Sequence, residues 1–556
     1  MIKHIRITLK TALFFPILIW INSCQNVDKL KFSNWFFYNE DQNLTTLDPA
    51  FTRTQSEIWV VSQMFEGLVE FDDQLNSVPC LAKSWDITDS GKVYTFHLRT
   101  DVFFHPFDSS EQSEISQTAP KKFKAEDVVF SFRRIADPKT ASPGAWIFND
   151  KMDLRCFTSN DSVPFPVIAL NDSTVQITLL KAFKPFLGIL SMNYCYIVPK
   201  GLVGPDFRSR PIGTGPFKFR KWEEEVGVLL GRNPLYYRFE NGKRLPHLDG
   251  VMVDNIKNKQ TAFMKFVHGE YDFFNGIDAT IKDELITRDG KLKANYAGKF
   301  NLIKSPFMNT EYIGFNIDPQ FSDHPLNNAD FRRAINFAID KNKLITYLRN
   351  GIGIPAKYGF VPLGMPGYDF NSIRQYHCNI DSALFYLKRS KVDVANMQEI
   401  VLNTTQDYLE LMIFVQKELQ KLGIKMKIDV HPSSFLRQLK KDQKINCFRG
   451  SWTADYPDAE NYLVCFETRN FSPGGPNYFH YSNPLYDQLM QSSIVEPNAE
   501  KRMKLMTSAE NLMMRDMPCI ILYYDESIRM SQKWVEGLTS NPNNFLRLRT
   551  VKKLKH

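Results

Sequence analysis

The chain has 556 residues, a formal net charge of +8, 43% hydrophobic residues and 23% charged residues. This length exceeds what a single hydrophobic core usually holds, so we expect two or three lobes. The balance of apolar and charged residues is that of a globular chain and excludes a largely disordered one. The positive charge forms no long basic block except at residues 551–556, so nucleic acid is not an expected partner.

The N-terminus has the pattern of a secretion signal. Basic residues lie among the first positions, and residues 11–21 form an apolar run that is too short to span a bilayer as a stable helix. Ser23 and Cys24 follow, and this arrangement resembles the processing box of bacterial lipoproteins, in which the Cys receives a lipid. We therefore expect residues 1–24 to be a lipoprotein signal peptide that ends at a lipidated Cys24. The alternative is an ordinary signal with an incidental Cys.

Hydrophobic periodicity predicts several elements in the first half of the mature chain. Helical spacing of apolar residues predicts a helix over residues 58–69, and an imperfect alternation predicts a strand over residues 93–98. The run that follows Lys124 predicts another helix. Glu126 and Asp127 lie in its first turn, where the helix dipole favours acidic side chains.

Two later stretches indicate α/β character. Asp330 is the expected N-cap of a helix whose apolar stripe lies within residues 331–339. Residues 415–422 have helical spacing and residues 424–430 alternate as a strand does, so Gly423 is the expected helix stop. A helix that leads directly into a strand places at least part of the chain in the α/β class.

The chain lacks the patterns that indicate catalysis or metal binding. None of its 8 cysteines lies in a CxxC pair or at zinc-finger spacing, and most are expected to be buried apolar side chains. The 10 histidines are dispersed, and the HExxH, GxSxG, Walker and dinucleotide-binding motifs are missing. We therefore expect no enzyme activity, no metal and no cofactor.

One stretch concentrates charge and aromatic rings. Residues 449–463, RGSWTADYPDAENYL, hold three carboxylates, one Trp and two Tyr. On chemistry alone, Asp455 and Asp458 could form a general acid–base pair or bind calcium. The stretch could equally be a turn or a cradle for a positively charged ligand. The residues by themselves leave these interpretations open.

A set of motifs occurs in a fixed order along the chain. They are LTTLDPAF, FEGLVEFD, KAEDVVFSFRRIADPKTASP, IGTGPFKF, FMKFVHGEYDFF, YIGFNID, FRRAINFAIDKNKLI, LQKLGIKMKI and SWTADYPDAENYL. This ordered set, over residues 44–524, resembles the solute-binding proteins of bacterial peptide ABC transporters, the dipeptide/oligopeptide-binding family (extracellular solute-binding protein family 5). The lipoprotein signal agrees with this resemblance, since such proteins are often lipid-anchored outside the membrane.

The resemblance implies an α/β fold: a two-lobed periplasmic-binding-protein clamp of the type II-like class, with an extra domain and the ligand between the lobes. Lobe I would comprise residues 25–65, 207–308 and 526–556, the extra domain residues 66–206, and lobe II residues 309–525. The lobes would close on the ligand by a hinge motion, and the closed complex would dock on a membrane permease driven by ATPase subunits.

The resemblance also implies how a peptide is held. The ligand lies as an extended strand whose backbone pairs with protein segments, so its side chains add little selectivity. Asp455 pairs with the ligand ammonium group, because a buried ammonium needs an opposite charge. The backbone-pairing residues implied by the family are Arg53, Thr54, Gln55, Ser451, Trp452 and Thr453.

A ligand carboxylate has two implied partners. Arg449 lies six residues before Asp455, where relatives often place an Arg, and a planar guanidinium binds a carboxylate through two hydrogen bonds. The alternative for Arg449 is a salt bridge to a neighbouring acid. Arg349 is a weaker candidate, against a solvated helix end. Three further residues fall where relatives line the pocket, with core or surface packing as the alternative: Tyr312, Asn275 and Tyr523.

The sequence departs from the family pattern at two places. Gly144 stands where the oligopeptide branch often has an aromatic residue that touches the peptide, and Trp146 is the expected substitute. Thr453 and Asn309 stand where some relatives have two bonded cysteines, so that disulfide cannot form here. The pocket can therefore differ in shape from that of its relatives.

The resemblance and the signal together predict a monomeric, lipid-anchored substrate-binding component of a peptide ABC importer. It would capture di- or oligopeptides on the periplasmic or extracellular face of the cell envelope and deliver them to a permease with ATPase subunits. The alternative is a binder of a non-peptide solute on the same fold, because family relatives carry metal chelates, haem or sugars.

Overall fold

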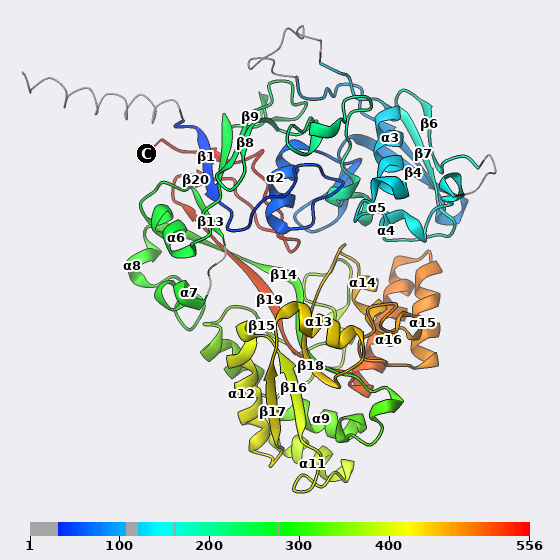
Figure 1. The fold of residues 1–556 in the computed structure, drawn as a ribbon, viewed down its shortest axis with the longest axis vertical. Coiled ribbons are helices and arrows are strands. Elements are labelled where there is room, and N and C mark those ends of the chain that lie inside the picture. Colours follow the sequence, from blue (N-terminus) through cyan, green and yellow to red (C-terminus); the bar gives the residue numbers. More distant parts are fainter. Residues whose placement is uncertain (1–31, 107–119, 159–162, 276, 278, 556) are drawn as a thin grey trace, which may run out of the picture.

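The structure, a computed structural model, describes residues 32–106, 120–158, 163–275, 277 and 279–555. The predicted signal peptide, including Cys24, lies outside the described residues. We keep the predicted ranges as the definitions of lobe I, the extra domain and lobe II. Figure 1 shows lobe I and the extra domain side by side in the upper half of the molecule and lobe II below them.

Two long strands cross from one lobe to the other. They are β14 (Phe300–Phe315) and β19 (Cys519–Gln532), and they pair antiparallel along nearly their whole length. Their register shifts between Pro306 and Thr310, next to a proline that cannot donate to the ladder. The predicted lobe boundaries, 308/309 and 525/526, fall at this irregularity. Figure 1 shows both strands running from the upper half into the lower half.

Lobe I extends the sheet on one side of β19. In spatial order its strands are β13 (Phe273–Asn275), β1 (Trp35–Asn39), β12 (Gly250–Asp254), β9 (Gly227–Arg232) and β8 (Phe217–Glu223). Two short hairpins are formed by β10 (Phe239–Glu240) with β11 (Lys243–Arg244) and by β20 (Val535–Glu536) with β21 (Lys552–Lys553). The helices are α2 (Gln55–Met64), α6 (Lys259–Val267), α7 (Ala279–Leu285) and α8 (Ala294–Ala297).

The extra domain has its own antiparallel sheet. The strand order is β4 (Ala82–Thr88), β5 (Val93–Leu98), β7 (Thr174–Thr178) and β6 (Val167–Asn171). A hairpin of β2 (Val69–Phe71) and β3 (Ser77–Pro79) precedes it. Its helices are α3 (Ala125–Ala136), α4 (Trp146–Asn149) and α5 (Phe186–Leu190).

Lobe II extends the sheet on the side of β14. In spatial order its strands are β18 (Cys447–Thr453), β16 (Ile400–Thr404) and β17 (Met426–Val430), while β15 (Ile354–Pro355) pairs with β19. The helices are α9 (Ala329–Ala338), α10 (Lys341–Lys343), α11 (Ile380–Ser390), α12 (Leu409–Gln420), α13 (Ser433–Lys441), α14 (Glu460–Leu463), α15 (Pro484–Val495) and α16 (Ala499–Asp516).

Most of the predicted elements are confirmed, with corrections at their ends. The strand over 93–98 is β5. The helix–strand unit around Gly423 is α12 followed by β17, and Gly423 has the left-handed φ of 75° expected at a helix stop. In α3 the carboxylate of Asp127 accepts a hydrogen bond from the backbone N–H of Lys124 at 3.0 Å.

Two predicted helix ends were wrong. The N-cap of α9 is Asn328, whose side chain accepts from the backbone N–H groups of Asp330 and Phe331, whereas Asp330 pairs with Arg333 and Arg389. The helix predicted over 58–69 ends at Met64. The carbonyl of Met64 accepts from Gly215 N–H at 2.8 Å, so a distant segment takes the place of the next helical turn.

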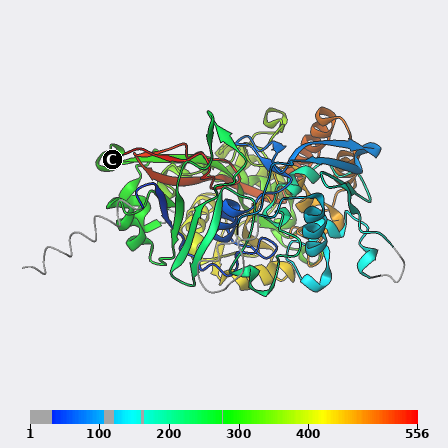
Figure 2. The ribbon, with the colours of Figure 1, turned by 90° about the horizontal axis from the view of Figure 1, so that it is seen from above.

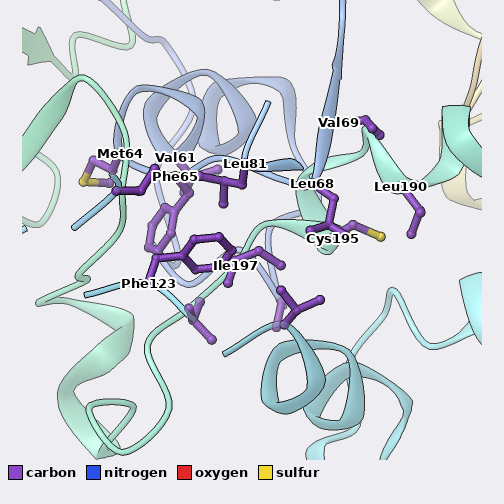
Figure 3. Packing of buried hydrophobic residues seen from close by; sticks show 14 of the residues in the cluster. Val61, Met64, Phe65, Leu68, Val69, Leu81, Phe123, Leu190, Cys195 and Ile197 are labelled. Atoms are coloured by element: carbon purple, nitrogen blue, oxygen red, sulfur yellow. The ribbon is translucent and has the colours of Figure 1, made fainter. Parts of the chain in front are cut away.

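The molecule has two large hydrophobic cores, as expected from its length. One is shared by lobe I and the extra domain, and the other fills lobe II. Figure 3 shows how the first core joins its two parts, because Val61 of α2 and Phe65, which directly follows α2, pack with Leu81, Phe123 and Ile197 of the extra domain. Figure 2 shows the extra domain at the opposite end from the C-terminus.

The seven cysteines of the described residues have free thiols, and five of them are buried. In the part of the chain that the structure describes, no helix is both long and apolar enough to cross a membrane.

Candidate ligand-binding site

Strand β18 has an open edge at its C-terminal end. One side pairs with β14, from Cys447 opposite Phe315 to Thr453 opposite Asn309. The other side meets β16 only at Phe448, so within the described residues the segment 450–453 has a strand partner on one side alone. Unpaired backbone donors and acceptors at a strand edge accept an extended chain. The predicted backbone-pairing residues Ser451, Trp452 and Thr453 therefore lie on an available edge.

Asp455 follows this edge directly. Its side chain is exposed to solvent, and no Lys or Arg among the described residues forms an ion pair with it. Although it contacts solvent, the surrounding protein partly desolvates its carboxyl group and raises the pKa, with a smaller opposing effect from a hydrogen bond with Asn461. The structure thus presents an accessible carboxylate without a cationic partner, which an ammonium group would stabilise.

The loop that carries Asp455 is held by its other polar residues. Tyr456 donates to Glu460 at 2.5 Å, and Asp458 accepts two hydrogen bonds of 2.9 Å from Arg502 of α16. Trp452 Nε1 donates to the Asn461 carbonyl at 2.8 Å. Asp458 therefore ties the loop to α16.

The same loop is where lobe II meets the extra domain. The rings of Tyr456 and Phe183 lie with centroids 6.3 Å apart, and a Cβ on Gly188 would lie 3.9 Å from Pro457. The carboxylate of Asp455 and the cation of Arg53 both act on the hydroxyl group of Tyr194, whose pKa burial raises. Asp455 thus lies near groups from all three parts of the chain.

Tyr194, rather than Trp146, fills the place of the missing aromatic at Gly144. A Cβ on Gly144 would lie only 2.6 Å from Cγ of Tyr194, so the ring of Tyr194 occupies the space of a side chain at position 144. Trp146 lies on α4 with 36% of its surface exposed and Lys151 over its ring. Sequence spacing missed Tyr194, because it lies fifty residues further along the chain and meets Gly144 only in the folded state.

The predicted segment of lobe I forms the start of α2. Thr54 is the N-cap, and its hydroxyl group accepts from the backbone N–H of Glu57. The carboxylate of Glu57 in turn accepts from the backbone N–H of Arg53 at 2.8 Å. Gln55 donates to the carbonyl of Asn544 at 3.4 Å. The backbone N–H groups of Arg53 and Thr54 are therefore already used in the cap, and the exposed Arg53 side chain is the part that faces solvent.

Arg449 is paired within the protein. Its Nη2 donates to Oε2 of Glu311 on the neighbouring strand, and its guanidinium carbon lies 3.2 Å from the centroid of the Tyr408 ring. Glu311 also accepts from Asn309 at 2.9 Å, and Asn309 accepts from Thr453 at 3.0 Å. The salt-bridge alternative given for Arg449 is the arrangement found.

Arg349 has a similar set of partners at the crossing of the two long strands. It donates to Asp525 at 2.7 Å, to the Tyr523 hydroxyl group at 2.9 Å and to the Ile352 carbonyl at 2.9 Å. Its guanidinium carbon lies 4.3 Å from the Tyr523 ring centroid. Both predicted carboxylate partners, Arg449 and Arg349, therefore each have an acidic side chain of their own.

Two of the predicted pocket residues lie elsewhere than expected. Tyr312 is 2% exposed, and its ring packs in the core of lobe II against Phe360 and Phe479, so it lines no surface. Strand alternation explains this, because Tyr312 points to the face opposite Glu311. Asn275 is half-buried at the end of β13, opposite Arg529 on β19, beside the crossing strands rather than beside Asp455.

Lys440 is a functional candidate that the sequence did not reveal. It lies on α13, half-buried, with its ammonium 5.4 Å from the Phe448 ring centroid and 5.1 Å from that of Tyr478. No described acid pairs with it, and burial followed by repulsion from Arg449 lowers its pKa to about 8. Its ammonium lies by Phe448, where β18 meets β16, and so is separate from the open edge at 450–453. No motif marks it, since lysines at helix ends are common.

A cavity of ≈60 Å³ lies away from these residues, between the end of α2, β2 and residues 545–549. Its charged groups are paired internally: Glu70 binds Arg238 and Arg549, and Arg547 binds Asp73. This complete pairing indicates a structural network.

The fold and the site define the class of this protein. Two lobes joined by crossing strands, with an open strand edge and an accessible carboxylate where they meet, are the arrangement of a two-lobed ligand-binding clamp. The family model of the bacterial extracellular solute-binding proteins, family 5 (middle region), matches residues 76–472. The chain belongs to this family.

Individual relatives cover nearly the same length. The chain is 26% identical over 506 residues to Heme-binding protein A of Haemophilus influenzae, covering 87% of this chain and 85% of the relative. It is 24% identical over 501 residues to the Dipeptide-binding protein of Escherichia coli, covering 86% and 87%. The solved structure of HbpA2 from Haemophilus parasuis superposes with a TM-score of 0.79 at 23% identity, over 94% of this chain and all (100%) of that one.

Proposed function

We propose that this protein is the substrate-binding component of a peptide ABC importer, which captures di- or oligopeptides with a free N-terminus and delivers them to a membrane permease with ATPase subunits. The observation that carries the proposal is Asp455: an accessible carboxylate without a cationic partner among the described residues, next to the open edge of β18. An extended peptide on that edge would bring its ammonium group to Asp455.

The physical reason is charge compensation. A ligand ammonium that leaves water needs an opposite charge and hydrogen bonds, and burial raises the pKa of the Asp455 carboxyl, so each group stabilises the charge of the other. The family supports transport rather than catalysis, since its members bind solutes. Peptide is the favoured solute because the edge offers backbone pairing, which does not depend on ligand side chains.

We place the protein in the cell envelope, anchored through a lipid on Cys24. The support is the sequence signal alone: a basic start, a short apolar run, and Cys24 after Ser23. Mass spectrometry of the mature N-terminal peptide tests the anchor, and an unmodified Cys24 thiol there would contradict it.

The binding proposal is tested with Asp455→Asn and calorimetry on peptide pairs that differ only in N-terminal acetylation. We expect the wild-type protein to bind the free-amine peptide at least tenfold more tightly than the acetylated one, and Asp455→Asn to lose that preference. Asp381→Asn is the matched control, because Asp381 lies exposed in the first turn of α11. Equal affinity of the wild-type protein for both peptides would contradict the role of Asp455 in binding the peptide ammonium group.

Mass spectrometry of ligand that co-purifies from the native host separates peptides from other solutes. A haem, metal chelate or sugar recovered in stoichiometric amount would replace the peptide proposal by the non-peptide alternative on the same fold.

A further inference from the structure

Glu311 is paired with Arg449, which directly precedes the open edge of β18. It lies on β14 opposite Ser451 and is 2% exposed. Because directly opposed residues of antiparallel strands share a face, Asn309 and Glu311 lie on the same face as Arg449, Ser451 and Thr453. The residues that would contact a ligand on this edge and the residues that hold Arg449 are therefore neighbours.

Arg449 is buried, with 12% of its side chain exposed, and its charge is already paired with Glu311. One guanidinium nitrogen donates to Glu311, and one face of the planar group is covered by the Tyr408 ring at 3.2 Å. Its Nε is buried without a hydrogen-bond partner. The Tyr408 hydroxyl group and Asn309 Nδ2 approach the same Glu311 oxygen, at 3.5 Å and 2.9 Å, so the carboxylate is fixed in place from three sides.

A ligand carboxylate that approached Arg449 would meet the carboxylate of Glu311 at the same guanidinium. Two carboxylates in one buried site repel each other and cannot both be ionised at low cost. Desolvation already raises the pKa of Glu311, and Asp525 adds to the repulsion. Arg349 offers no alternative in the same cluster, because Asp525 holds it.

We propose that Glu311 is a specificity-determining residue, which withholds Arg449 from the ligand so that the site selects amine-bearing ligands without requiring a free carboxylate at this position. The inference rests on the proposed function and names its substrate class: peptides whose carboxyl end is blocked, or extends beyond the Arg449 position.

The test compares alanine peptides of three, four and five residues, each as the free acid and as the C-terminal amide, by calorimetry. The wild-type protein should bind the acid and the amide of each length within about threefold. Glu311→Gln keeps the shape and one acceptor of the side chain but removes its charge, so it should prefer the acid at least tenfold at one length. The double variant Glu311→Gln with Arg449→Gln should lose that preference.

Asp525→Asn is the matched control, since it frees Arg349 in the same cluster. A tenfold acid preference in Asp525→Asn but not in Glu311→Gln would overturn the role of Glu311. A tenfold preference of the wild-type protein for the free acid would also overturn the role of Glu311. This wild-type measurement tests the inference even if Glu311→Gln fails to fold. Absence of binding of any peptide would overturn the proposed function, and this inference with it, whereas peptide binding with acid preference overturns the inference alone.

Discussion

The carboxylates of Glu311, Asp525 and Asp455 have different partners, and these partners separate their roles. Glu311 and Asp525 each hold an arginine, while Asp455 has no cationic partner among the described residues. These arginines neutralise the charges of Glu311 and Asp525. Of the three carboxylates, Asp455 is therefore the one that a ligand cation would stabilise. The contrast follows from position, since Asp455 lies beyond the end of the strand and the other two lie within the sheet.

The raised pKa of Asp455 predicts an acid limb in ligand binding. The carboxylate binds an ammonium only when ionised, so affinity should fall as pH drops through that raised pKa, by up to about tenfold per pH unit below it. Affinity should also fall above about pH 8, where a peptide amine loses its proton. Calorimetry from pH 3.5 to 9 checks both limbs. In Asp455→Asn the affinity should no longer fall at low pH. If it still falls as in the wild-type protein, another group is responsible for the pH dependence.

The sequence located some of these residues and not others, for a physical reason. Asp455, Ser451 and Thr453 lie in one short stretch, so local pattern was enough. Arg449 was found, but its partner Glu311 lies 138 residues away, and no local signal pairs them. Tyr194 is separated from Gly144 along the chain in the same way. Lys440 differs from other lysines because folding removes water from around its ammonium group, and no sequence pattern shows this.

At the scale of elements, the loop 455–460 is a small unit braced from both sides. Tyr456 packs toward the extra domain through Phe183, and Asp458 is bound by Arg502 of α16 through two hydrogen bonds. The loop can therefore present Asp455 without large local motion, because the residues that flank it are fixed in two different parts of the chain.

Arg502→Ala is expected to destabilise this unit. The pair is mostly buried, with 9% and 17% of the two side chains exposed. Removal of Arg502 leaves Asp458 without its partner and should lower the free energy of unfolding by about 3 kcal/mol. Urea denaturation checks the value. Lys504→Ala on the same helix breaks an exposed pair with Glu500 and should leave stability unchanged. Equal effects of both variants would contradict the bracing role.

Element types followed from periodicity where one face of an element is apolar. The helix–strand unit around Gly423 and the strand β5 are of this kind. The ends of α9 and α2 were mispredicted because a helix end depends on which group bonds the backbone N–H and C=O groups that have no partner within the helix. At α9 the side chain of Asn328, rather than that of Asp330, accepts from the first backbone N–H groups. At α2 the N–H of Gly215, rather than one from a further helical turn, donates to the carbonyl of Met64.

For the whole molecule, the clamp predicts closure around a bound ligand. The lobes are joined at the register shift of β14 and β19, where Glu526 accepts from Gly353 N–H at 2.8 Å and lies 3.4 Å from the ammonium of Lys304. Saturating peptide should lower the radius of gyration measured by small-angle X-ray scattering. Asp455→Asn at the same peptide concentration should keep the larger value. A radius that does not change for the wild-type protein would contradict hinge closure.

The crossing of β14 and β19 also constrains the order in which the chain can acquire its structure. Lobe I holds the first described residues, yet its strand β13 pairs with β19, which is made only after all of lobe II. A chain emerging from a ribosome or a secretion channel therefore cannot complete its N-terminal lobe until residues 519–532 have arrived. Until then β13 and β14 present unpaired edges, which are sites of aggregation. The pairing of β13 with β19 therefore makes the completion of lobe I one of the last steps in the folding of the chain.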